Sequence, residues 1–579
     1  MVIGLKYIEI IEKNSELEKA MGGPEYHILV LSNIIVHQLK EILEYELRSE
    51  GIAAEVSFGD YDNIIQESGN VSLARTVILF WEASNLIDGF QYKASIMDSS
   101  VKKELIEKIK LEIDFVLERL KGVPLVIWNR FSSLVFGPHP LWSNELENIC
   151  LELNNHVERK KGSNVVLVDT DKVVARLSVE KSVDFRYYYA SKSLYSISFL
   201  RAYSGMVKPA ILAAEGKAKK ALIFDCDNTL WKGIIGEDGL EGIRIGGKYP
   251  YQEIQSLVKD LGRHGVIIGL CSKNNPDDVT EVFQSHEDMV LKEEDIVIKK
   301  VNWLDKATNL RAIASELNIG LDSLVFVDDS DFEISFIKEN LPEVTVLKVP
   351  EKLHEYPAVI RDNIGLFFKS SVTKEDRQKT QMYKEKLVRQ EAREKFSKLD
   401  DYLRSLKLKV TVFCDDKQFI PRMSQMTQKT NQFNLTTNRY TEKEIEQFCE
   451  SPDAALYVFK EQDRFGDNGL SALVIIRFNE EKKEAYIDSF MMSCRILGRN
   501  IELIIMNYLV AQLAVRGIKL LKSRYRATLK NMQVKNFYES VGFDCVDIED
   551  KKKEYEIAIE SYESRKIDYV EVVESWKKG

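Results

Sequence analysis

Three short apolar segments in the middle of the chain, each ending in polar side chains, constrain its fold more than any other feature. They read ALIFDCD at residues 221–227, GVIIGLCS at 265–272 and SLVFVDDS at 323–330. Helix-like segments at 251–265 and 306–319 separate them. This alternation predicts a parallel α/β sheet. Because open α/β sheets bind ligands at the carboxyl ends of their strands, the polar residues there predict a functional site.

The first segment places two carboxylates at one strand end. Asp225 and Asp227 lie two residues apart, and such residues share a face of a strand. Both can therefore face one bound Mg²⁺, and Asp225 can attack phosphorus to form an aspartyl phosphate. Asp227 can act first as general acid and then as general base. We expect Thr229 and the turn after it to order this loop and to contact the substrate.

The other two segments, with the helix between them, supply the remaining groups of a phosphoryl-transfer site. Ser272 offers a hydroxyl to a phosphoryl oxygen, and Asn274 is expected to contact the substrate. Lys306 opens a helix and offers a cation to the same phosphoryl group. Mg²⁺ prefers oxygen ligands, and of the adjacent Asp328 and Asp329 the second is the better candidate. The predicted metal ligands are Asp225, Asp227 and Asp329.

The rest of the chain predicts flanking regions of different character. Residues 25–215 alternate strand-like and helix-like segments, which predicts a second parallel α/β domain over residues 1–215. Residues 216–372 hold the central sheet. The highly charged residues 373–406 predict a solvated helical connector. Residues 407–579 mix strands with helices and predict an α+β domain.

Composition narrows the partners and the compartment. The chain has 579 residues and a formal net charge of −10, and it shows no basic stripe of the kind that binds nucleic acid. No apolar run is long enough to span a bilayer, so no membrane partner is expected. The seven cysteines form no Cys-x-x-Cys pair, which argues against a zinc site or a disulfide framework. These features predict a cytoplasmic protein with reduced thiols.

The four central motifs resemble the haloacid dehalogenase superfamily. They are DCDNT at 225–229, the strand ending in Ser272, the helix opening with Lys306, and VDDS at 327–330. The resemblance implies a nucleophile at Asp225, an acid/base at Asp227, Ser and Lys roles at Ser272 and Lys306, and a metal ligand at Asp329. Asp328 is the weaker ligand candidate. The short gaps between the motifs leave no room for a large cap domain, so an open site is expected.

Longer strings resemble the FkbH-like family over about residues 25–550. They include DCDNTLWKGIIGEDGLEGI, VNWLDKATNL, FVDDSDFE and RMSQMTQKTNQFNLTTNRY. The family implies a bifunctional enzyme that takes a glyceryl group from 1,3-bisphosphoglycerate, removes the phosphate and loads glyceryl onto the phosphopantetheine arm of an acyl carrier protein. Such products feed polyketide or tetronate assembly. Cys226 stands where the family has Leu, and as a small buried hydrophobe it should not impair activity.

The two flanking domains resemble known folds as well. Residues 1–215 resemble the SGNH-hydrolase fold, with Ser32 at the nucleophile position and His139 and Asp184 as further candidates. Because the hydrolase motifs are degenerate, a scaffold or carrier-docking domain is the favoured interpretation, and a hydrolase site is the alternative. The last domain resembles a GNAT acyltransferase, in which a turn before a helix meets the coenzyme A pyrophosphate. Here that turn is 495–500, and Asn500 replaces its last Gly or Ala. A pantetheine arm without the nucleotide remains compatible.

A path for the acyl group is predicted in the last domain. Residues 422–440 carry Lys429, Asn431, Gln432, Asn434 and Arg439, of which Asn431 and Arg439 are the predicted substrate contacts. The alternative is a capped loop–helix junction. Cys494 is the predicted thioester carrier, because a helix N-terminus and the cations Arg495 and Arg499 would lower its pKa. Cys271 is the rival thiol, and an inert buried Cys494 is the remaining alternative.

Two other functions compete with glyceryl transfer. A plain Mg²⁺-dependent phosphatase of a small metabolite would need only the central domain. A non-catalytic docking protein for an assembly line would not need the acidic constellation around Asp225.

Overall fold

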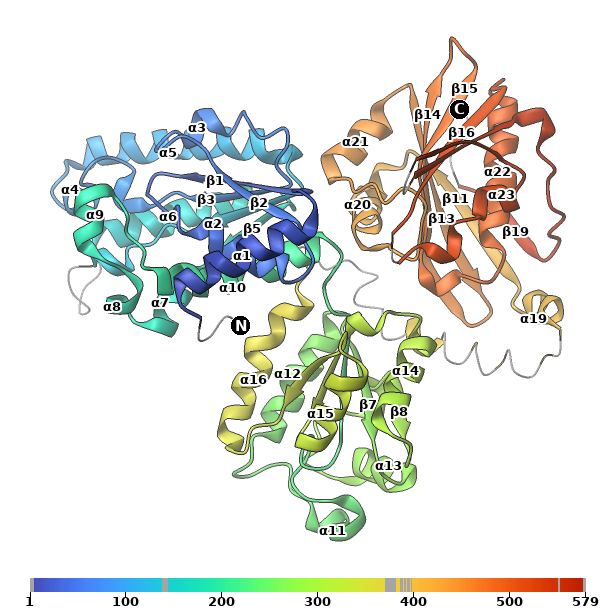
Figure 1. Cartoon of the computed structure of the whole chain (residues 1–579), viewed down its shortest axis with the longest axis horizontal. Helices are drawn as coiled ribbons and strands as arrows, with labels where there is room; N and C mark the ends of the chain where they lie inside the picture. Colours follow the sequence, from blue (N-terminus) through green and yellow to red (C-terminus); the bar gives the residue numbers. More distant parts are fainter. Residues whose placement is uncertain are drawn as a thin grey trace. The chain divides into compact units, whose positions relative to one another are not determined.

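The computed structural model describes residues 5–137, 144–369, 382–385, 389, 392, 396, 398–528, 530–549 and 552–575, with the side chain of Cys494 left out. The chain divides between Glu215 and Gly216 into two compact units. The first holds one sheet, and the second holds two (Figure 1). The predicted fold class, a multidomain α/β protein with parallel sheets, is confirmed.

The N-terminal unit is a five-stranded parallel sheet with helices on both faces. Its strands lie in the order β2 (Ala54–Phe58), β1 (Tyr26–Ser32), β3 (Thr76–Phe80), β4 (Leu125–Asn129) and β5 (Val165–Val168). Helices α5 (Ser99–Arg119) and α6 (Glu145–Lys160) pack on one face. Helices α1 (Tyr7–Met21), α2 (Leu39–Arg48) and α10 (Ile197–Ala214) pack together on the other (Figure 1). The short helices are α3 (Ile64–Glu67), α4 (Phe90–Lys93), α7 (Asp171–Leu177), α8 (Val179–Ser182) and α9 (Phe185–Ser191).

The central sheet is also five-stranded and parallel. The order is β10 (Thr345–Lys348), β9 (Leu324–Asp328), β6 (Ala221–Phe224), β7 (Ile267–Ser272) and β8 (Ile298–Val301). Helices α12 (Tyr251–Arg263), α13 (Pro276–Ser285) and α16 (Tyr356–Asn363) cover one face. Helices α14 (Lys306–Leu317) and α15 (Asp331–Asn340) cover the other. Because both faces are covered, every residue of β6, β7 and β9 is buried.

Only a small insertion follows β6. It contains α11 (Ile235–Gly242) and an antiparallel bridge between Lys232 and Arg244. Cys226, between the two motif aspartates, is fully buried in the core on the α12 side. The described chain between β6 and β7 therefore contains no large cap domain, as the short spacing predicts.

The C-terminal sheet is mixed. Its strands lie in the order β17 (Asp544–Glu549), β18 (Lys552–Ala558), β16 (Leu520–Arg526), β15 (Glu484–Met492), β14 (Gly466–Asn479), β13 (Ala454–Asp463), β11 (Leu408–Cys414) and β19 (Val570–Glu574), and β12 (Phe433–Asn434) pairs with β15. Helices α20 (Ile420–Lys429) and α21 (Glu442–Glu450) cover one face. Helices α19 (Leu399–Ser405), α22 (Ile501–Val515) and α23 (Phe537–Ser540) cover the other (Figure 1).

The predicted connector at 373–406 lies partly outside the described residues. Its described part includes Arg389 and the helix α19, which packs into the C-terminal core. Among the helices that the structure describes, none combines the length and the apolar character needed to cross a membrane.

Candidate phosphoryl-transfer site

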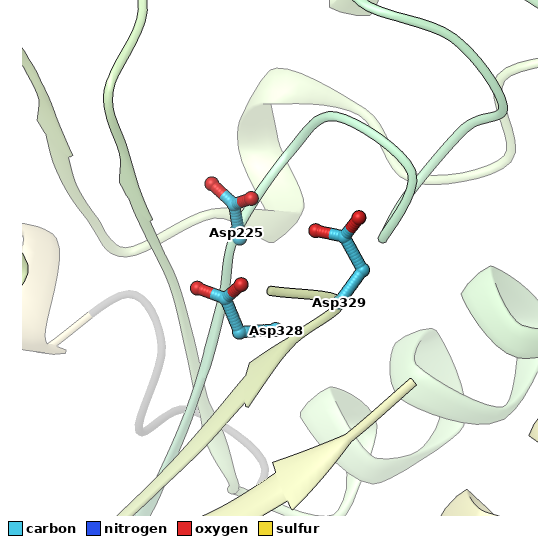
Figure 2. Close-up of side chains that lie close together, drawn as sticks. All are labelled: Asp225, Asp328 and Asp329. Carbon is cyan, nitrogen blue, oxygen red and sulfur yellow. The ribbon is translucent and has the colours of Figure 1, made fainter. Parts of the chain in front are cut away.

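The carboxyl ends of β6 and β9 bring three carboxylates together. Asp225 directly follows β6, and its backbone N–H donates to the carbonyl of Val327 at 3.0 Å, which extends the pairing with β9. Asp328 ends β9 and Asp329 follows it. One oxygen of each carboxylate lies within 4.8 Å of the others. Figure 2 shows the three side chains gathered at these two strand ends.

Lys306 supplies the cation of this cluster. It is the first residue of α14, which Asp305 caps by accepting from the backbone N–H of Thr308 at 2.7 Å. The Lys306 ammonium lies 3.2 Å from Asp225 Oδ1 and 2.6 Å from Asp328 Oδ2. The lysine is 4% exposed, so these ion pairs are shielded from water. The capped helix start therefore fixes a buried cation between two strand ends.

Burial and the neighbouring charges together shift the pKa values of the cluster. Burial raises the pKa of Asp225 to about 6, against the lowering effect of Lys306. Burial, followed by the charge of Asp225, raises the pKa of Asp329. Burial opposes the charge on Lys306, but Asp225 and Asp328 outweigh it and raise the lysine pKa. The lysine thus stays charged while the carboxylates compete for positive charge.

The charge and donor chemistry of the cluster fit a divalent cation. Three carboxylates face a single ammonium, so the cluster carries excess negative charge. Their oxygens are hard ligands of the kind that Mg²⁺ prefers. Asp225, Asp328 and Asp329 are therefore the residues that would hold the ion, and Asp328 enters the ligand set more firmly than the sequence predicted.

Asp227 has a different environment from the one predicted. Its Oδ1 accepts from the Trp231 indole N–H at 2.9 Å and the backbone N–H of Ile235 at 3.1 Å. Its Oδ2 accepts from Asn274 Nδ2 at 2.9 Å. The three-carboxylate cluster among the described residues does not include Asp227. Three donors instead orient its carboxylate beside the cluster, because the chain turns after β6 rather than continuing as a strand.

Asn274, Ser272 and Thr229 support this arrangement. Asn274 Nδ2 also donates to Ser272 Oγ at 3.2 Å, so one amide links the acid/base to the hydroxyl. The Ser272 hydroxyl lowers the pKa of Asp225, although burial outweighs it. Thr229 orders the loop through its backbone, which donates to the Cys226 carbonyl at 3.1 Å. In this state Asn274 and Thr229 position their neighbours, and their predicted contacts to substrate stay predictions.

Cys271 lies on the opposite face of β7 from Ser272. It is fully buried in the core formed with α14, and burial raises the pKa of its thiol well above the ordinary value. A buried neutral thiol is a poor nucleophile. The geometry therefore disfavours Cys271 as an acyl carrier.

The sequence did not single out two residues that hold the site. Trp231 is fully buried and binds Asp227, and the tryptophan four residues after the second motif aspartate was the available signal. Tyr356, from α16, donates to the Thr229 carbonyl at 3.2 Å. Nothing in the sequence linked it to a loop more than a hundred residues away.

The candidate acyl-transfer residues lie in the C-terminal sheet domain. Cys494 begins a short 3₁₀ turn after β15, and its side chain lies outside the described part of the chain. Arg499 is buried and pairs with Glu461 and Asp463, and Arg495 donates to Ser493 Oγ at 3.1 Å. Both arginines are therefore engaged within the fold.

The predicted contacts of the 422–440 segment lie on either side of β12. Asn431 is half-buried just before this strand, and Arg439 donates to the Gln428 carbonyl. Their contacts with a substrate stay predictions.

Two of the three predicted hydrolase residues lie in the described part of the N-terminal domain. Ser32 Oγ donates to the Ile34 carbonyl at 2.8 Å. Asp184 caps α9 and pairs with Arg186, and His139 lies outside the described residues. A buried carboxyl group at this end of the sheet belongs to Glu82, which accepts from the Tyr195 hydroxyl at 2.7 Å.

The chain matches no protein-family model and no curated protein. Among solved structures it is similar to the N-terminal part of the Bacteroides fragilis protein BF1531, which contains a phosphatase domain and was crystallised with Mg. The two are 26% identical, the TM-score is 0.55, and the match covers 63% of this chain and 100% of that one.

N-acetyltransferases also match, over a smaller share of the chain. The ribosomal-protein-S18-alanine N-acetyltransferase of Escherichia coli is 16% identical over 26% of this chain and 94% of its own, with a TM-score of 0.21. A spermidine N-acetyltransferase of Vibrio cholerae is 13% identical over 27% of this chain and 96% of its own, also at 0.21. These scores are too low to support an argument, so the C-terminal domain is described from its own topology.

Proposed function

We propose that the central domain is a Mg²⁺-dependent phosphatase in which Asp225 is the nucleophile. The observation that carries the proposal is the buried Asp225 carboxylate, which Lys306 holds by an ion pair. It lies beside Asp328 and Asp329 at the carboxyl ends of two neighbouring strands. The similarity to a phosphatase domain crystallised with Mg supports it. A phosphoryl site needs positive charge around the equatorial oxygens, and Lys306 supplies the protein's share.

The residues suggest a two-step reaction. An oxygen of Asp225 bonds to phosphorus while the bond to the leaving oxygen breaks, and the leaving oxygen takes a proton from Asp227. Water then attacks the aspartyl phosphate, Asp227 takes a proton from that water, and inorganic phosphate leaves. Asp227 suits this role because Trp231, Ile235 and Asn274 orient its carboxylate outside the metal cluster. When bound, Mg²⁺ would neutralise charge on the phosphoryl oxygens.

We further propose that the phosphatase acts within glyceryl transfer from 1,3-bisphosphoglycerate to an acyl carrier protein. The support is the FkbH-like resemblance of the strings around residues 225, 306, 328 and 431. The small insertion after β6 is compatible with a carrier-bound substrate, which needs an open approach. A plain phosphatase is the competing function, because the described site alone satisfies it.

One assay separates these functions. Purified full-length chain is incubated with Mg²⁺, 1,3-bisphosphoglycerate and a holo carrier protein, and both the carrier mass and free phosphate are followed over time. A glyceryl mass gain on the carrier supports the transferase. Phosphate release above the non-enzymatic rate without that gain supports a plain phosphatase. If neither the glyceryl adduct nor free phosphate forms, both functions are contradicted for this substrate.

Metal dependence is tested on the same reaction. Metal-stripped protein in excess EDTA should release no phosphate above background, and added Mg²⁺ should restore the rate. Full activity of the stripped protein would contradict the metal assignment. Asp225→Asn serves as the matched control, because it keeps the shape of the side chain but cannot form the acyl phosphate.

A further inference from the structure

Two neighbouring strands of the C-terminal sheet separate along their length. β15 and β16 are parallel and pair only from Glu484↔Leu520 to Ile487↔Ser523. β15 continues to Met492 and β16 to Arg526. The main-chain groups of the separated ends need hydrogen-bond partners. An extended ligand arm with amide groups can provide them by adding as a strand, so this gap is where a pantetheine arm would fit.

The chain itself fills the gap. β12 lies antiparallel to the far end of β15, with Phe433 opposite Met492 and Asn434 opposite Met491. The backbone N–H of Leu435 then donates to the Phe490 carbonyl of β15 at 3.1 Å. The carbonyl of Leu435 accepts from the backbone N–H of Arg526 in β16 at 2.8 Å. Leu435 therefore bridges the two separated strands.

Side chains hold this segment in place from within the core. Phe433 packs against the rings of Phe490 and Phe537, with centroids 5.2 and 5.4 Å away, and Leu435 is fully buried. Asn531 Nδ2 donates to the carbonyls of both Asn434 and Arg526 at 2.8 Å. Asn531 is itself fully buried. One buried amide thus ties the inserted segment to the end of β16.

A second anchor follows the segment. The Tyr440 hydroxyl donates to Asp488 Oδ2 at 2.5 Å, and Asn438 Nδ2 donates to the Asp488 carbonyl at 3.1 Å. Arg477 pairs with the other carboxylate oxygen at 3.1 Å. Asp488 lies at the irregularity where β14 and β15 shift register. Both ends of residues 433–440 are therefore fastened to β15 or β16.

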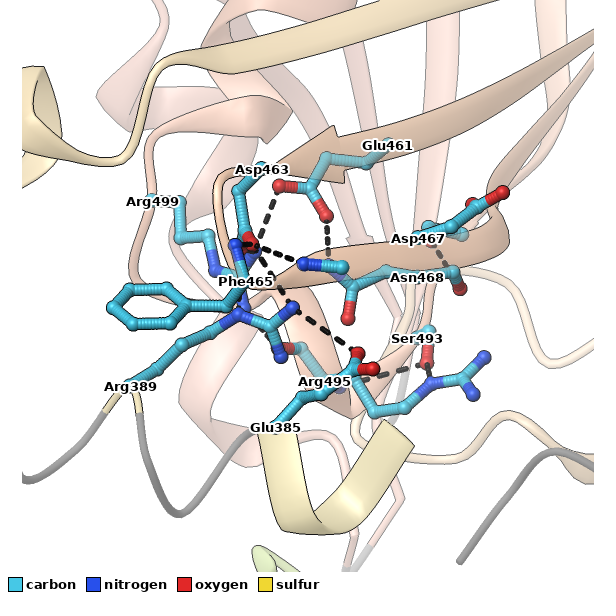
Figure 3. A network of polar contacts seen from close by, with 12 residues as sticks. Glu385, Arg389, Glu461, Asp463, Phe465, Asp467, Asn468, Ser493, Arg495 and Arg499 are labelled. Carbon is cyan, nitrogen blue, oxygen red and sulfur yellow. Dashed lines mark hydrogen bonds and ion pairs between the residues drawn. The ribbon is translucent and has the colours of Figure 1, made fainter. Parts of the chain in front are cut away.

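The turn before α22 is also engaged within the fold (Figure 3). Arg499 lies 2.7 Å from Glu461 and 3.1 Å from Asp463, and Arg389 lies 2.6 Å from Asp463. The two carboxylates are almost fully buried, so they neutralise these arginines with little screening by water. Asn500 Nδ2 donates to the Tyr569 hydroxyl at 2.7 Å. The charges of Arg389 and Arg499 are therefore already neutralised by carboxylates of the fold and are not free to bind the diphosphate of coenzyme A.

We propose that residues 433–435 are a permanent built-in strand that excludes coenzyme A and its thioesters from the gap between β15 and β16. The C-terminal domain is then not an acyl-CoA-dependent acyltransferase. Its acyl donor belongs to the class without a pantetheine arm, such as an acyl phosphate, and a carrier arm is acylated outside this gap. The statement about the donor rests on the proposed function, whereas the exclusion itself does not.

Binding and hydrogen exchange test the exclusion without using activity. The full-length chain is titrated with coenzyme A and acetyl-coenzyme A up to 1 mM in a calorimeter, and exchange of the Leu435 and Arg526 amides is measured with and without them. We expect no saturable binding and strong protection of both amides in either condition. Saturable binding would overturn the exclusion, whether or not protection changes. Rapid exchange of both amides in the free protein would show that the strand is not permanent.

A pair of variants tests the anchor. Asn531→Ala removes the two donated bonds and should raise exchange of the Leu435 amide at least tenfold. Asn507→Ala is the matched control, because Asn507 bonds to Tyr562 and Arg565 in the chain after β18. It should leave the Leu435 amide unchanged. Equal effects of the two variants on exchange of the Leu435 amide would show that Asn531 does not anchor the segment. If Asn531→Ala does not fold, the measurements on the wild-type protein decide the proposal.

Discussion

The N-terminal and central sheets are both five-stranded and parallel, and both bury carboxylates at the carboxyl ends of their strands. They differ in what those carboxylates face. In the central sheet Asp225 lies 3.2 Å from the Lys306 ammonium and shares its edge with two further aspartates. In the N-terminal sheet Glu82 faces the Tyr195 hydroxyl and, within the described residues, makes no ion pair.

The titration of the two groups reflects this difference. Burial raises the pKa of Asp225 to about 6 while Lys306 resists the rise. Burial raises the pKa of Glu82 to about 7, and only the bond from Tyr195 resists it. A buried strand-end carboxylate is a candidate nucleophile where a cation favours its charged form, and it keeps its proton to a higher pH where no cation lies beside it.

The largest effect expected from this comparison is that of Asp225→Asn. An amide cannot attack phosphorus as a carboxylate does, so phosphate release should fall by about four orders of magnitude or more. The fold should persist, because asparagine has the same shape. Phosphate release and thermal unfolding measure the two effects. Release near the wild-type rate would refute the assignment of the nucleophile.

Removing the cation should have the next largest effect. Lys306→Met leaves Asp225 and Asp328 without the ammonium that both now contact. We expect at least about a hundredfold slower phosphate release and a loss of about 3 kcal/mol in unfolding free energy. Lys300→Met is the control, since that lysine pairs with Glu316 at an outer strand. Similar losses in both variants would mean that the position of Lys306 has no special role.

Variants of Asp227 and Asp329 should differ in whether they lower the turnover rate or the affinity for Mg²⁺. Asp227→Asn removes the acid/base and should slow turnover about a hundredfold or more at saturating Mg²⁺. It should change Mg²⁺ affinity little, because Asp227 lies outside the carboxylate cluster. Asp329→Asn should instead weaken Mg²⁺ binding at least about tenfold. Calorimetric titration with Mg²⁺ alone makes the comparison, and an equal loss of affinity in both variants would restore Asp227 to the ligand set.

The sequence predicted the parts of the site that depend on strand periodicity. The spacing of the apolar runs located β6, β7 and β9 and the polar residues that follow them. It also put Cys271 and Ser272 on opposite faces of β7, as the structure has them.

The sequence missed what depends on how the chain turns after a strand. Strand alternation predicted that the Asp227 carboxylate faces the metal, and in the structure this carboxylate accepts hydrogen bonds from Trp231 and Asn274 after the chain turns at the end of β6. Its role as a metal ligand stays a prediction. The insertion of β12 between β15 and β16 depends on long-range backbone pairing, which leaves little local signal. Glu82 was missed because a lone glutamate after a strand does not reveal its burial.

Glu82→Gln tests the other sheet of the comparison, in which, among the described residues, no cation lies beside the buried carboxyl group. The pKa of Glu82 is about 7 in the folded chain and ordinarily about 4.5. The contribution of protonated Glu82 to the unfolding free energy is therefore fully present below pH 4.5. It is lost as pH rises through 7, and the total loss is about 3 kcal/mol. Glutamine does not ionise, so the variant should gain up to that amount over wild type at pH 8 and little at pH 5. The exposed Glu16→Gln is the control in urea unfolding at both pH values. A gain independent of pH would contradict the buried neutral carboxyl.

The smallest effect is expected at Ser32, which stands at the nucleophile position of the SGNH-hydrolase fold that the N-terminal sequence resembles. Its hydroxyl donates to the Ile34 carbonyl at 2.8 Å, a local bond across the turn that follows β1. A nucleophilic serine needs a base to take its proton. Ser32→Ala should therefore leave phosphate release unchanged and lower the unfolding free energy by about 1 kcal/mol or less, the usual value of one local hydrogen bond. The decisive measurement is labelling with a fluorophosphonate probe, which reacts with activated serines. Wild type and Ser32→Ala should label equally weakly, and strong labelling of wild type that disappears in the variant would show that the N-terminal sheet carries a catalytic site of its own.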